Sequence, residues 1–286
     1  MFRRATRLAS QPRVRSVVHR QPTARVPSLG VRELHGKGDL LRVLVEKELR
    51  TRYVHTFLGP IWIVANPLVP ALLFTFVFTK VVPVETKGVG YFSLVTAALV
   101  PWATVNRSLM RGGNCLIAER QLLTKVYIPR LLFPLTVVST AIIDLVASIL
   151  VAMGSLYMGG GTVGVRILWL PVLVVWTLAI ALGLILVLSG SSVYRRDVLY
   201  ALPMLIQVWL YLTPVMYPAS AMPQSIRRLL WLNPLAPIAQ CYQWVITGSE
   251  VVVVNHVLLS VAMTGMLLVI GLFVFAKGSS VVADAV

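Results

Sequence analysis

Residues 131–158 read LLFPLTVVSTAIIDLVASILVAMGSLYM, and this stretch decides the fold class. Its only charged side chain is Asp144, and apolar residues fill most of the remaining positions. A helix needs about 20 apolar residues to cross the roughly 30 Å hydrocarbon core of a bilayer. The stretch exceeds that length, so we expect a membrane-spanning helix with room to tilt.

Further apolar runs of spanning length lie on both sides of this one. They cover residues 61–82, 91–110, 167–193, 198–217 and 251–276. The whole chain of 286 residues is 57% hydrophobic and only 13% charged, which is more apolar surface than one soluble core could bury. The sequence therefore predicts an all-α polytopic membrane protein, with six transmembrane helices between residues 61 and 276. Pro203 and Pro214 interrupt the fifth run, which indicates a helix that lines an interface or a polar cavity.

The positions of the basic residues decide between two interpretations of the net charge of +16. A nucleic-acid-binding protein would gather them on one folded face. Here they fall in the gaps between apolar runs, mostly on one side of the predicted spans, as the positive-inside rule expects. We therefore expect membrane lipids and no nucleic acid as partners. Both termini, including a short tail at residues 277–286, are predicted to be cytoplasmic.

A charged interruption precedes the opening stretch, at residues 114–130. Leu116, Leu122 and Val126 belong to an apolar stripe at helical spacing, while Glu119 and Lys125 belong to the polar face. Pro129 would end this predicted cytoplasmic helix. Periodicity leaves two interpretations open: an anchor at the membrane surface, or a docking surface for a soluble partner.

A second amphipathic helix is predicted at residues 39–60, ahead of the first span. Apolar residues recur at helical spacing, and Glu46 is placed for an i to i+4 ion pair with Arg50. Gly59 and Pro60 would end the helix. We expect it to lie in the plane of the membrane interface.

Several short strings, in order from about Gly38 to the end of the chain, resemble one known family. They are ELRTRYVHTFLGPIWIVANP, LLTKVYIPRLLFP, VYRRDV, LTPVMYP and LNPLAPI. The chain resembles the membrane subunit of type 2 ATP-binding-cassette exporters, in the polysaccharide and polyol-phosphate group that includes O-antigen and teichoic-acid exporters.

The resemblance implies roles for particular positions. Coupling to an ATPase subunit would fall on Leu122, Lys125, Val126, Tyr127, Pro129 and Arg130. Residues Arg52, Tyr53, Gly59 and Pro60 would belong to a gate helix, and residues 219–248 to a re-entrant external segment. The implied assembly has two ATPase subunits and a second copy of this chain, with a polyprenyl-linked glycan as the substrate.

No GxxxxGK[ST] motif occurs in the sequence, so no phosphate-binding loop for ATP is expected in this chain. We expect no enzyme activity and no cofactor here, and we expect ATP and Mg²⁺ in the partner subunit. The predicted function is the permease of an ATP-driven exporter for a polyprenyl-linked polysaccharide. Alternatives are a drug or lipid exporter of the same fold, and a secondary transporter or membrane enzyme. The last would use Asp144 as a proton relay, whereas the structural alternative buries Asp144 among polar groups of neighbouring helices.

Aromatic and basic residues offer candidate contacts with the substrate. Trp62, Trp102, Tyr211 and Tyr217 lie near predicted span ends, where they fit either an ordinary aromatic belt or the lining of a glycan path. Arg227 and Arg228 lie on the predicted external side. They would contact either a departing phosphate group or water and lipid headgroups.

The first 38 residues are rich in Arg, Ser, Thr and Pro, with no acidic residue before Glu33. This composition fits a disordered basic cytoplasmic tail, and it also fits an organellar transit peptide. The resemblance favours the bacterial cytoplasmic membrane, with an organelle membrane as the alternative.

Overall fold

The computed structural model describes residues 34, 36–53, 59, 61–81, 89–119, 122, 128–217, 230–249 and 252–284. The regular elements in these ranges are all helices, which confirms the predicted fold class at this level. They are α1 (Gly38–Tyr53), α2 (Ile61–Phe76), a π-helical turn (Val77–Val81), α3 (Tyr91–Gly112), α4 (Cys115–Ala118), α6 (Leu132–Met158), a 3₁₀ turn (Val165–Trp169), α7 (Leu170–Tyr194), α8 (Asp197–Leu212), a 3₁₀ turn (Leu230–Leu232), α10 (Leu235–Thr247) and α11 (Val254–Asp284).

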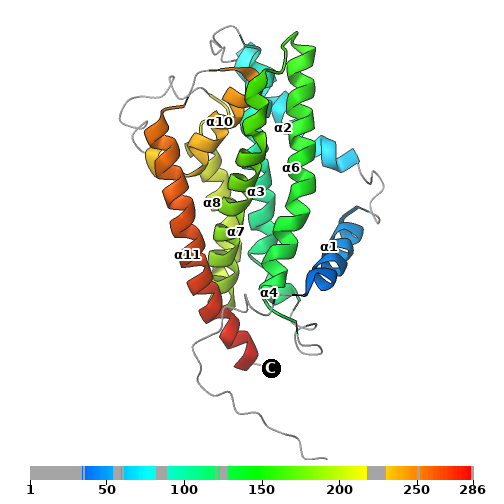
Figure 1. Cartoon of the computed structure of the whole chain (residues 1–286), viewed down its shortest axis with the longest axis vertical. Coiled ribbons are helices and arrows are strands. Elements are labelled where there is room, and N and C mark those ends of the chain that lie inside the picture. Colours follow the sequence, from blue (N-terminus) through cyan, green and yellow to red (C-terminus); the bar gives the residue numbers. More distant parts are fainter. Residues whose placement is uncertain are drawn as a thin grey trace, which may run out of the picture.

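The long helices form an elongated bundle (Figure 1). Helices α3, α6, α7, α8 and α11 run along its length, whereas α2 and α10 lie toward one end and α4 at the other. Helix α1 lies outside the bundle and packs against α6. Residues 195 and 196 join α7 to α8 at the end that also holds α4.

Among the described residues, four helical segments are long and apolar enough to cross a membrane. They are Ile61–Val81, Leu132–Met158, Val165–Tyr194 and Val254–Ser279. Helix α3 has 22 residues but falls outside this group, and α8 is a shorter apolar helix of 16 residues. A polytopic membrane protein therefore fits, while six spans remain a prediction.

Two helix ends differ from the predicted bounds for local reasons. Helix α8 ends at Leu212 because Thr213, which precedes Pro214, has an extended backbone (φ −105°, ψ 130°). The residue before a proline is disfavoured in helical conformation. Helix α11 continues to Asp284, through the predicted tail, because no proline interrupts it.

The predicted amphipathic helix at 114–130 is not continuous. Helix α4 ends at Ala118, since Glu119 leaves the helical conformation (φ −97°, ψ 18°). Leu116 of the predicted apolar stripe is fully buried. Ile128 and Pro129 are not helical, and residues 120–127, apart from Leu122, lie outside the described residues.

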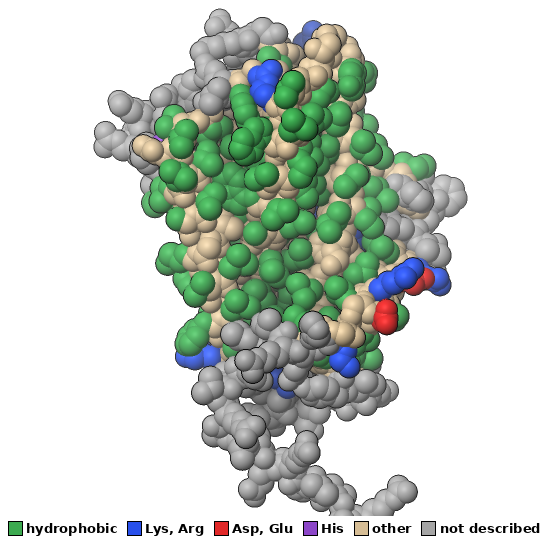
Figure 2. All heavy atoms as spheres, viewed as in Figure 1, with side chains coloured by type: hydrophobic (Ala, Val, Ile, Leu, Met, Phe, Trp, Pro, Cys, Tyr) green, Lys and Arg blue, Asp and Glu red, His purple; other side chains and the backbone are tan. Residues whose placement is uncertain are grey.

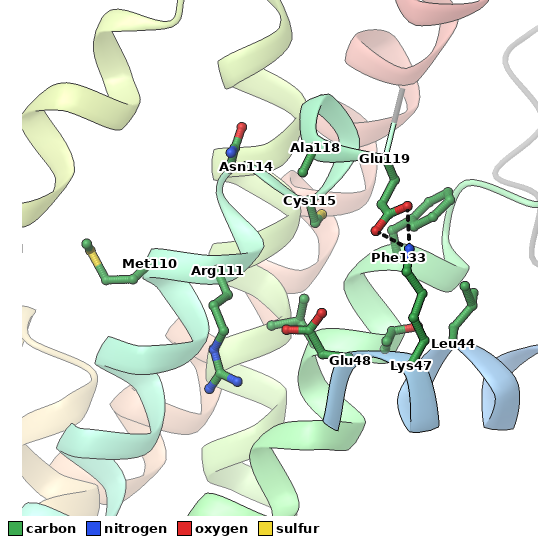
Figure 3. Close-up of a pocket in the computed structure, with 12 residues that line it drawn as sticks. Leu44, Lys47, Glu48, Met110, Arg111, Asn114, Cys115, Ala118, Glu119 and Phe133 are labelled. Carbon is green, nitrogen blue, oxygen red and sulfur yellow. Dashed lines mark hydrogen bonds and ion pairs between the residues drawn. The ribbon is translucent and has the colours of Figure 1, made fainter. Parts of the chain in front are cut away.

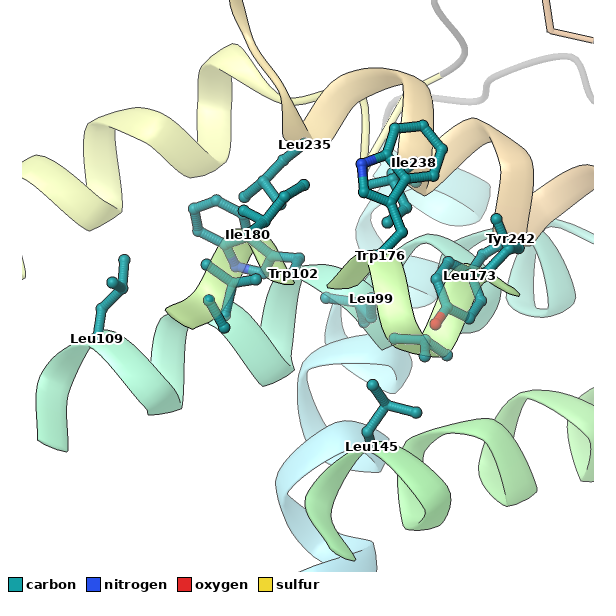
Figure 4. Packing of buried hydrophobic residues seen from close by; sticks show 14 of the residues in the cluster. Leu99, Trp102, Leu109, Leu145, Leu173, Trp176, Ile180, Leu235, Ile238 and Tyr242 are labelled. Carbon is teal, nitrogen blue, oxygen red and sulfur yellow. The ribbon is translucent and has the colours of Figure 1, made fainter. Parts of the chain in front are cut away.

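Helix α3 is the centre of the core, because it packs against α2, α6, α7 and α10. Figure 4 shows Leu99, Trp102 and Leu109 of α3 among apolar side chains of α6, α7 and α10. Ser93 and Thr96 of α3 both bond to Ser155 of α6, as in the 2.7 Å hydrogen bond between the Thr96 and Ser155 hydroxyls. The core therefore combines apolar packing with hydrogen bonds between helices.

Helices α7 and α11 form the most extensive helix pair. Their contact is lined by glycines, since a Cβ at Gly271 would lie 2.7 Å from the Gly183 carbonyl oxygen. Small residues of this kind allow the backbones of membrane helices to approach closely.

The outer surface is apolar over most of its length (Figure 2). Only 11% of the most apolar window of α2 and 17% of that of α11 are buried within the chain. The Lys and Arg side chains visible in this view gather toward the two ends and along α1. This distribution is the one that a bilayer requires of the proteins it surrounds.

Candidate functional site

Asp144 lies near the middle of α6 with only 2% of its side chain exposed. Its Oδ2 atom accepts a hydrogen bond from Arg52 Nη1 at 3.0 Å and another from Arg111 Nη2 at 2.8 Å. Arg107 Nε lies 3.9 Å from the same oxygen. We call these four residues the Asp144 cluster. It joins α1, α3 and α6 through one carboxylate.

Helical spacing explains how the cluster forms. On α6, Thr140 and Ser148 lie one turn before and one turn after Asp144, so the three polar side chains share a face. Thr140 Oγ1 lies 3.4 Å from Arg52 Nη2, and Ser148 Oγ lies 3.4 Å from Arg107 Nη2.

The facing arginines on α3, Arg107 and Arg111, are also one turn apart. The Arg111 Nε atom donates to the Arg107 carbonyl at 3.0 Å, which fixes the direction of that side chain.

A cavity of about 310 Å³ adjoins the cluster. Arg111 belongs both to the cluster and to the cavity wall, and Glu48 of the wall lies 3.7 Å from Arg52 of the cluster. We call it the α1 cavity, because α1 closes one side of it (Figure 3). Its volume is at the lower end of the range for ligand pockets. The lining residues are Leu44, Lys47, Glu48, Met110, Arg111, Asn114, Cys115, Ala118, Glu119, Phe133, Thr136 and Val137.

An ion pair joins two of the lining residues. Lys47 Nζ lies 2.8 Å and 2.9 Å from the two carboxylate oxygens of Glu119, so it connects α1 to the residue that follows α4 (Figure 3). The Cys115 thiol forms part of the wall, and burial raises its pKa to about 12. At neutral pH the thiol is therefore protonated and uncharged.

The predicted gate helix corresponds to α1, and its ion pair between Glu46 and Arg50 is confirmed at 2.6 Å. Arg52 belongs to the Asp144 cluster, whereas Tyr53 ends the helix. Gly59 is described and has a positive φ of 44°, a conformation that glycine adopts readily. Pro60 lies outside the described residues.

The predicted coupling residues are described only in part. Leu122 packs against the hydrophobic core, and Pro129 belongs to the connection into α6. Arg130 Nη1 donates to the carbonyl oxygen of Ser279 on α11, which ties this connection to the end of α11. Lys125, Val126 and Tyr127 lie outside the described residues.

The four candidate aromatic residues occupy different environments. Trp102 is only 4% exposed and packs edge to face against Trp209, with ring centroids 5.7 Å apart. Its ring is thus enclosed by the chain's own core (Figure 4). Trp62 and Tyr211 are exposed, and the Tyr217 hydroxyl donates to the Tyr211 carbonyl. The structure therefore brings Tyr211 and Tyr217 together, whereas Trp102 is buried in the core.

The predicted re-entrant segment contains α10, which packs against α3 and α7. Asn233 precedes α10 and accepts hydrogen bonds from Trp209 Nε1 and the Leu235 amide, both at 3.0 Å. Its Nδ2 atom donates to the Leu212 carbonyl and to Thr213 Oγ1. Asn233 thus joins the start of α10 to the end of α8. Arg227 and Arg228 lie outside the described residues.

Residues 39–247, which include most of α1, the Asp144 cluster and α10, match the family described as "ABC-2 type transporter". The chain belongs to this ABC-2 type transporter family. The resemblance to type 2 ATP-binding-cassette exporters is thereby confirmed. As a family member with long apolar helices, the chain is a membrane-embedded permease.

Named relatives of this ABC-2 type transporter come from two bacteria. The O-antigen export system permease protein RfbA of Myxococcus xanthus is 32% identical over 217 residues, which cover 74% of this chain and 82% of that protein. Two proteins of the same name from Klebsiella pneumoniae are 28% and 27% identical over 242 residues. These alignments cover 84% of this chain and 92% of each relative.

Sequence reasoning missed the Asp144 cluster in this ABC-2 type transporter. It expected Asp144 to bond to polar groups of neighbouring helices, and the structure confirms that environment. It did not connect Asp144 with Arg52, Arg107 or Arg111. The sequence did contain a signal for these contacts. Arg107 and Arg111 are four residues apart at the end of a predicted span, so they share one helix face. If that face is buried, the two arginines need an acidic partner.

Proposed function

We propose that this chain is the permease subunit of an exporter that moves a polyprenyl-linked polysaccharide out of the bacterial cytoplasm. The observation that carries the proposal is the match to relatives named as O-antigen export permeases, across 74% to 84% of this chain. The family match covers residues 39–247, which include most of α1 and the Asp144 cluster.

The proposed architecture has six membrane crossings, with both termini in the cytoplasm. Helices α3 and α8 would provide the two crossings that length and composition alone do not identify. Two copies of the chain would enclose the path for the glycan. The apolar face of α8 supports this arrangement, since Tyr200 is 84% exposed and Met204 is 68% exposed. The paired Tyr211 and Tyr217 at the end of α8 would face the path.

ATP hydrolysis is assigned to a partner ATPase, because this sequence has no phosphate-binding loop of its own. The ATPase would dock on the segment between α4 and α6, with Lys125, Tyr127 and Arg130 in the contact. Two contacts support a mechanical role for this segment: the Lys47–Glu119 ion pair to α1 and the Arg130 bond to α11. Movement of the segment would thus reach both α1 and the bundle.

The test combines assembly with export. The gene is deleted in its bacterial host, and surface polysaccharide and intracellular lipid-linked glycan are measured. We expect loss of the surface polymer and accumulation of the intracellular glycan. Co-expression with the adjacent ATPase should yield a complex whose ATP turnover depends on the permease.

A variant with Lys125→Ala and Tyr127→Ala should lose both the complex and export. The matched control is Arg195→Ala, an exposed residue in the turn between α7 and α8 at the same end of the bundle, and it should retain both. Normal surface polysaccharide after deletion would refute the proposed function. Equal behaviour of the two variants would refute the docking assignment alone.

A further inference from the structure

We propose that Asn233 is a positioning residue that holds the end of α8 against the start of α10 and thereby limits the width of the export path at this end of the bundle. The inference rests on the proposed function, in which α8 is a wall of the path between two copies. Asn233 would act through α8, without touching the glycan.

The first observation is that the shaft of α8 has little contact with the bundle. Within α8, which is described in full, only Leu202 and Ile206 are buried. Tyr200, Met204 and Val208 are 84%, 68% and 50% exposed. Apolar packing against the chain's own core therefore does little to fix the position of this helix.

The second observation is that the end of α8 is held firmly. Thr213, which follows the helix, is fully buried, and Val215 is only 1% exposed. Asn233 Nδ2 donates to the Leu212 carbonyl at 3.2 Å and to Thr213 Oγ1 at 2.9 Å. Its Oδ1 atom accepts from Trp209 Nε1 at 3.0 Å. One side chain thus binds three residues at the end of α8.

The third observation is that Asn233 is itself fixed to the other elements at this end. Its side chain is buried, and its Oδ1 atom also accepts from the Leu235 amide at the start of α10. Ser260 of α11 donates to the carbonyl of the next residue, Pro234, at 2.6 Å. The amide of Asn233 uses two donor and two acceptor positions, which is its full capacity.

These contacts give α8 an anchor at one end and a lightly packed shaft. Figure 1 shows α10 at the end of the bundle away from the C-terminus, which is the external end in the proposed architecture. Tyr211, which is 58% exposed, lies on the last turn of α8, which Asn233 holds. Loss of the anchor would let Tyr211 and Tyr217 move away from the second copy and widen the path.

The test measures the leak of a small solute, with the full chain reconstituted into liposomes that contain radiolabelled sucrose. The unmodified chain should retain the sucrose. We expect Asn233→Leu to release it about fivefold faster or more, because a leucine of similar size makes none of the four bonds and leaves buried partners unpaired.

Asn233→Asp supplies a pH profile for the same position. An ionised carboxylate cannot donate to the Leu212 carbonyl, whereas a protonated one donates with one oxygen and accepts with the other, as the amide does. Burial favours the protonated form, so we expect a leak at about pH 8 that falls toward the unmodified level at about pH 5. In the described part of the chain, the groups bonded to Asn233 are uncharged, and Asn233→Leu should leak equally at both values.

A matched pair of tryptophan variants separates positioning from stability. Trp209→Phe removes one bond to Asn233, and Trp176→Phe removes an indole bond of the same length, 3.0 Å, to Thr264 between α7 and α11. Both should lower the unfolding temperature in detergent, but only Trp209→Phe should leak.

Equal leaks from the two tryptophan variants would overturn the proposal, as would full retention of sucrose by both variants of Asn233. A leak from Asn233→Asp that does not change with pH would also contradict it. The assay needs neither ATP nor polysaccharide, so a negative result leaves the export test intact. Normal surface polysaccharide after gene deletion would refute the proposed function without changing the leak.

Discussion

The carboxylate of Asp144 is held by arginines from two other helices, and this arrangement sets its energetic role. Removing a carboxylate from water is costly, and three guanidinium groups together with nearby hydroxyls compensate for that cost. The compensation is mutual, because Arg52, Arg107 and Arg111 are each only about one-fifth exposed. These contacts favour a structural role for Asp144 over a proton relay.

Replacing Asp144 with Asn is therefore expected to destabilise the fold by about 3 kcal/mol or more, because it leaves three arginines without their shared carboxylate. Thermal unfolding in detergent measures the change. The control is Glu46→Gln, which breaks the exposed pair with Arg50 and should cost less than about 1 kcal/mol. Similar effects of the two substitutions would contradict this account of the cluster.

For single residues, the sequence predicts whether a side chain is buried better than it predicts which side chain it contacts. The burial of Asp144 and the Glu46–Arg50 pair follow from positions along one helix. The Arg52–Asp144 bond does not, because helical periodicity gives the spacing on one helix and not which helices adjoin. The same limit explains Trp102, whose burial against Trp209 depends on the contact between α3 and α8.

Helices α7 and α11 show how small residues determine the distance between two elements. Gly183 and Gly190 on α7 face Gly271 and Gly278 on α11, and each pair is seven residues apart. A Cβ at Gly190 would lie 2.7 Å from the Val274 carbonyl oxygen. Side chains at these positions would force the backbones apart.

We expect Gly190→Ala and Gly271→Ala each to destabilise the protein by about 1–3 kcal/mol, because the added methyl groups meet backbone atoms that cannot move aside. Gly265→Ala is the matched control on α11, since nothing lies within 4 Å of the added Cβ. It should be neutral, or stabilising by up to about 1 kcal/mol, through helix propensity. Thermal unfolding measures the stability of the three variants. An equal loss of stability in all of them would exclude close helix packing as the cause.

Elements were predicted well where they consist of long apolar runs. The ranges 61–82, 91–110 and 131–158 agree closely with α2 and its π-helical turn, α3 and α6. The ends of α8 and α11 and the break after Ala118 were missed. Apolar length determines that a segment enters the bundle, whereas local backbone geometry determines where the helix ends.

On the scale of the whole molecule, the N-terminal part is attached differently from the rest. Helix α1 is held to the bundle by packing of Leu44 and by ionic contacts to Glu119 and Asp144. The bundle itself is held by close backbone contact and buried apolar side chains. A ligand or a docking partner that competes for the charged groups would therefore act on α1 before it acts on the bundle.

The polarity of α3 has a consequence for the order of synthesis. Its buried polar side chains face α6, α7 and α10, which leave the ribosome later. When α3 first reaches the insertion machinery, Asp144 has not yet been synthesised, and placing Arg107 and Arg111 in lipid without that carboxylate is costly. We expect chains truncated after Asn114 to leave α3 outside the bilayer.

Chains that extend through α6 should integrate α3, because Asp144 then supplies a partner for both arginines. A topology reporter fused after each truncation measures this, with Asp144→Ala in the longer chain as the control that should reduce integration. Efficient insertion of α3 from the shortest chain would contradict the expectation. The carboxylate that joins α1, α3 and α6 in the finished bundle would then also time its assembly, since α3 would wait in the insertion machinery for α6.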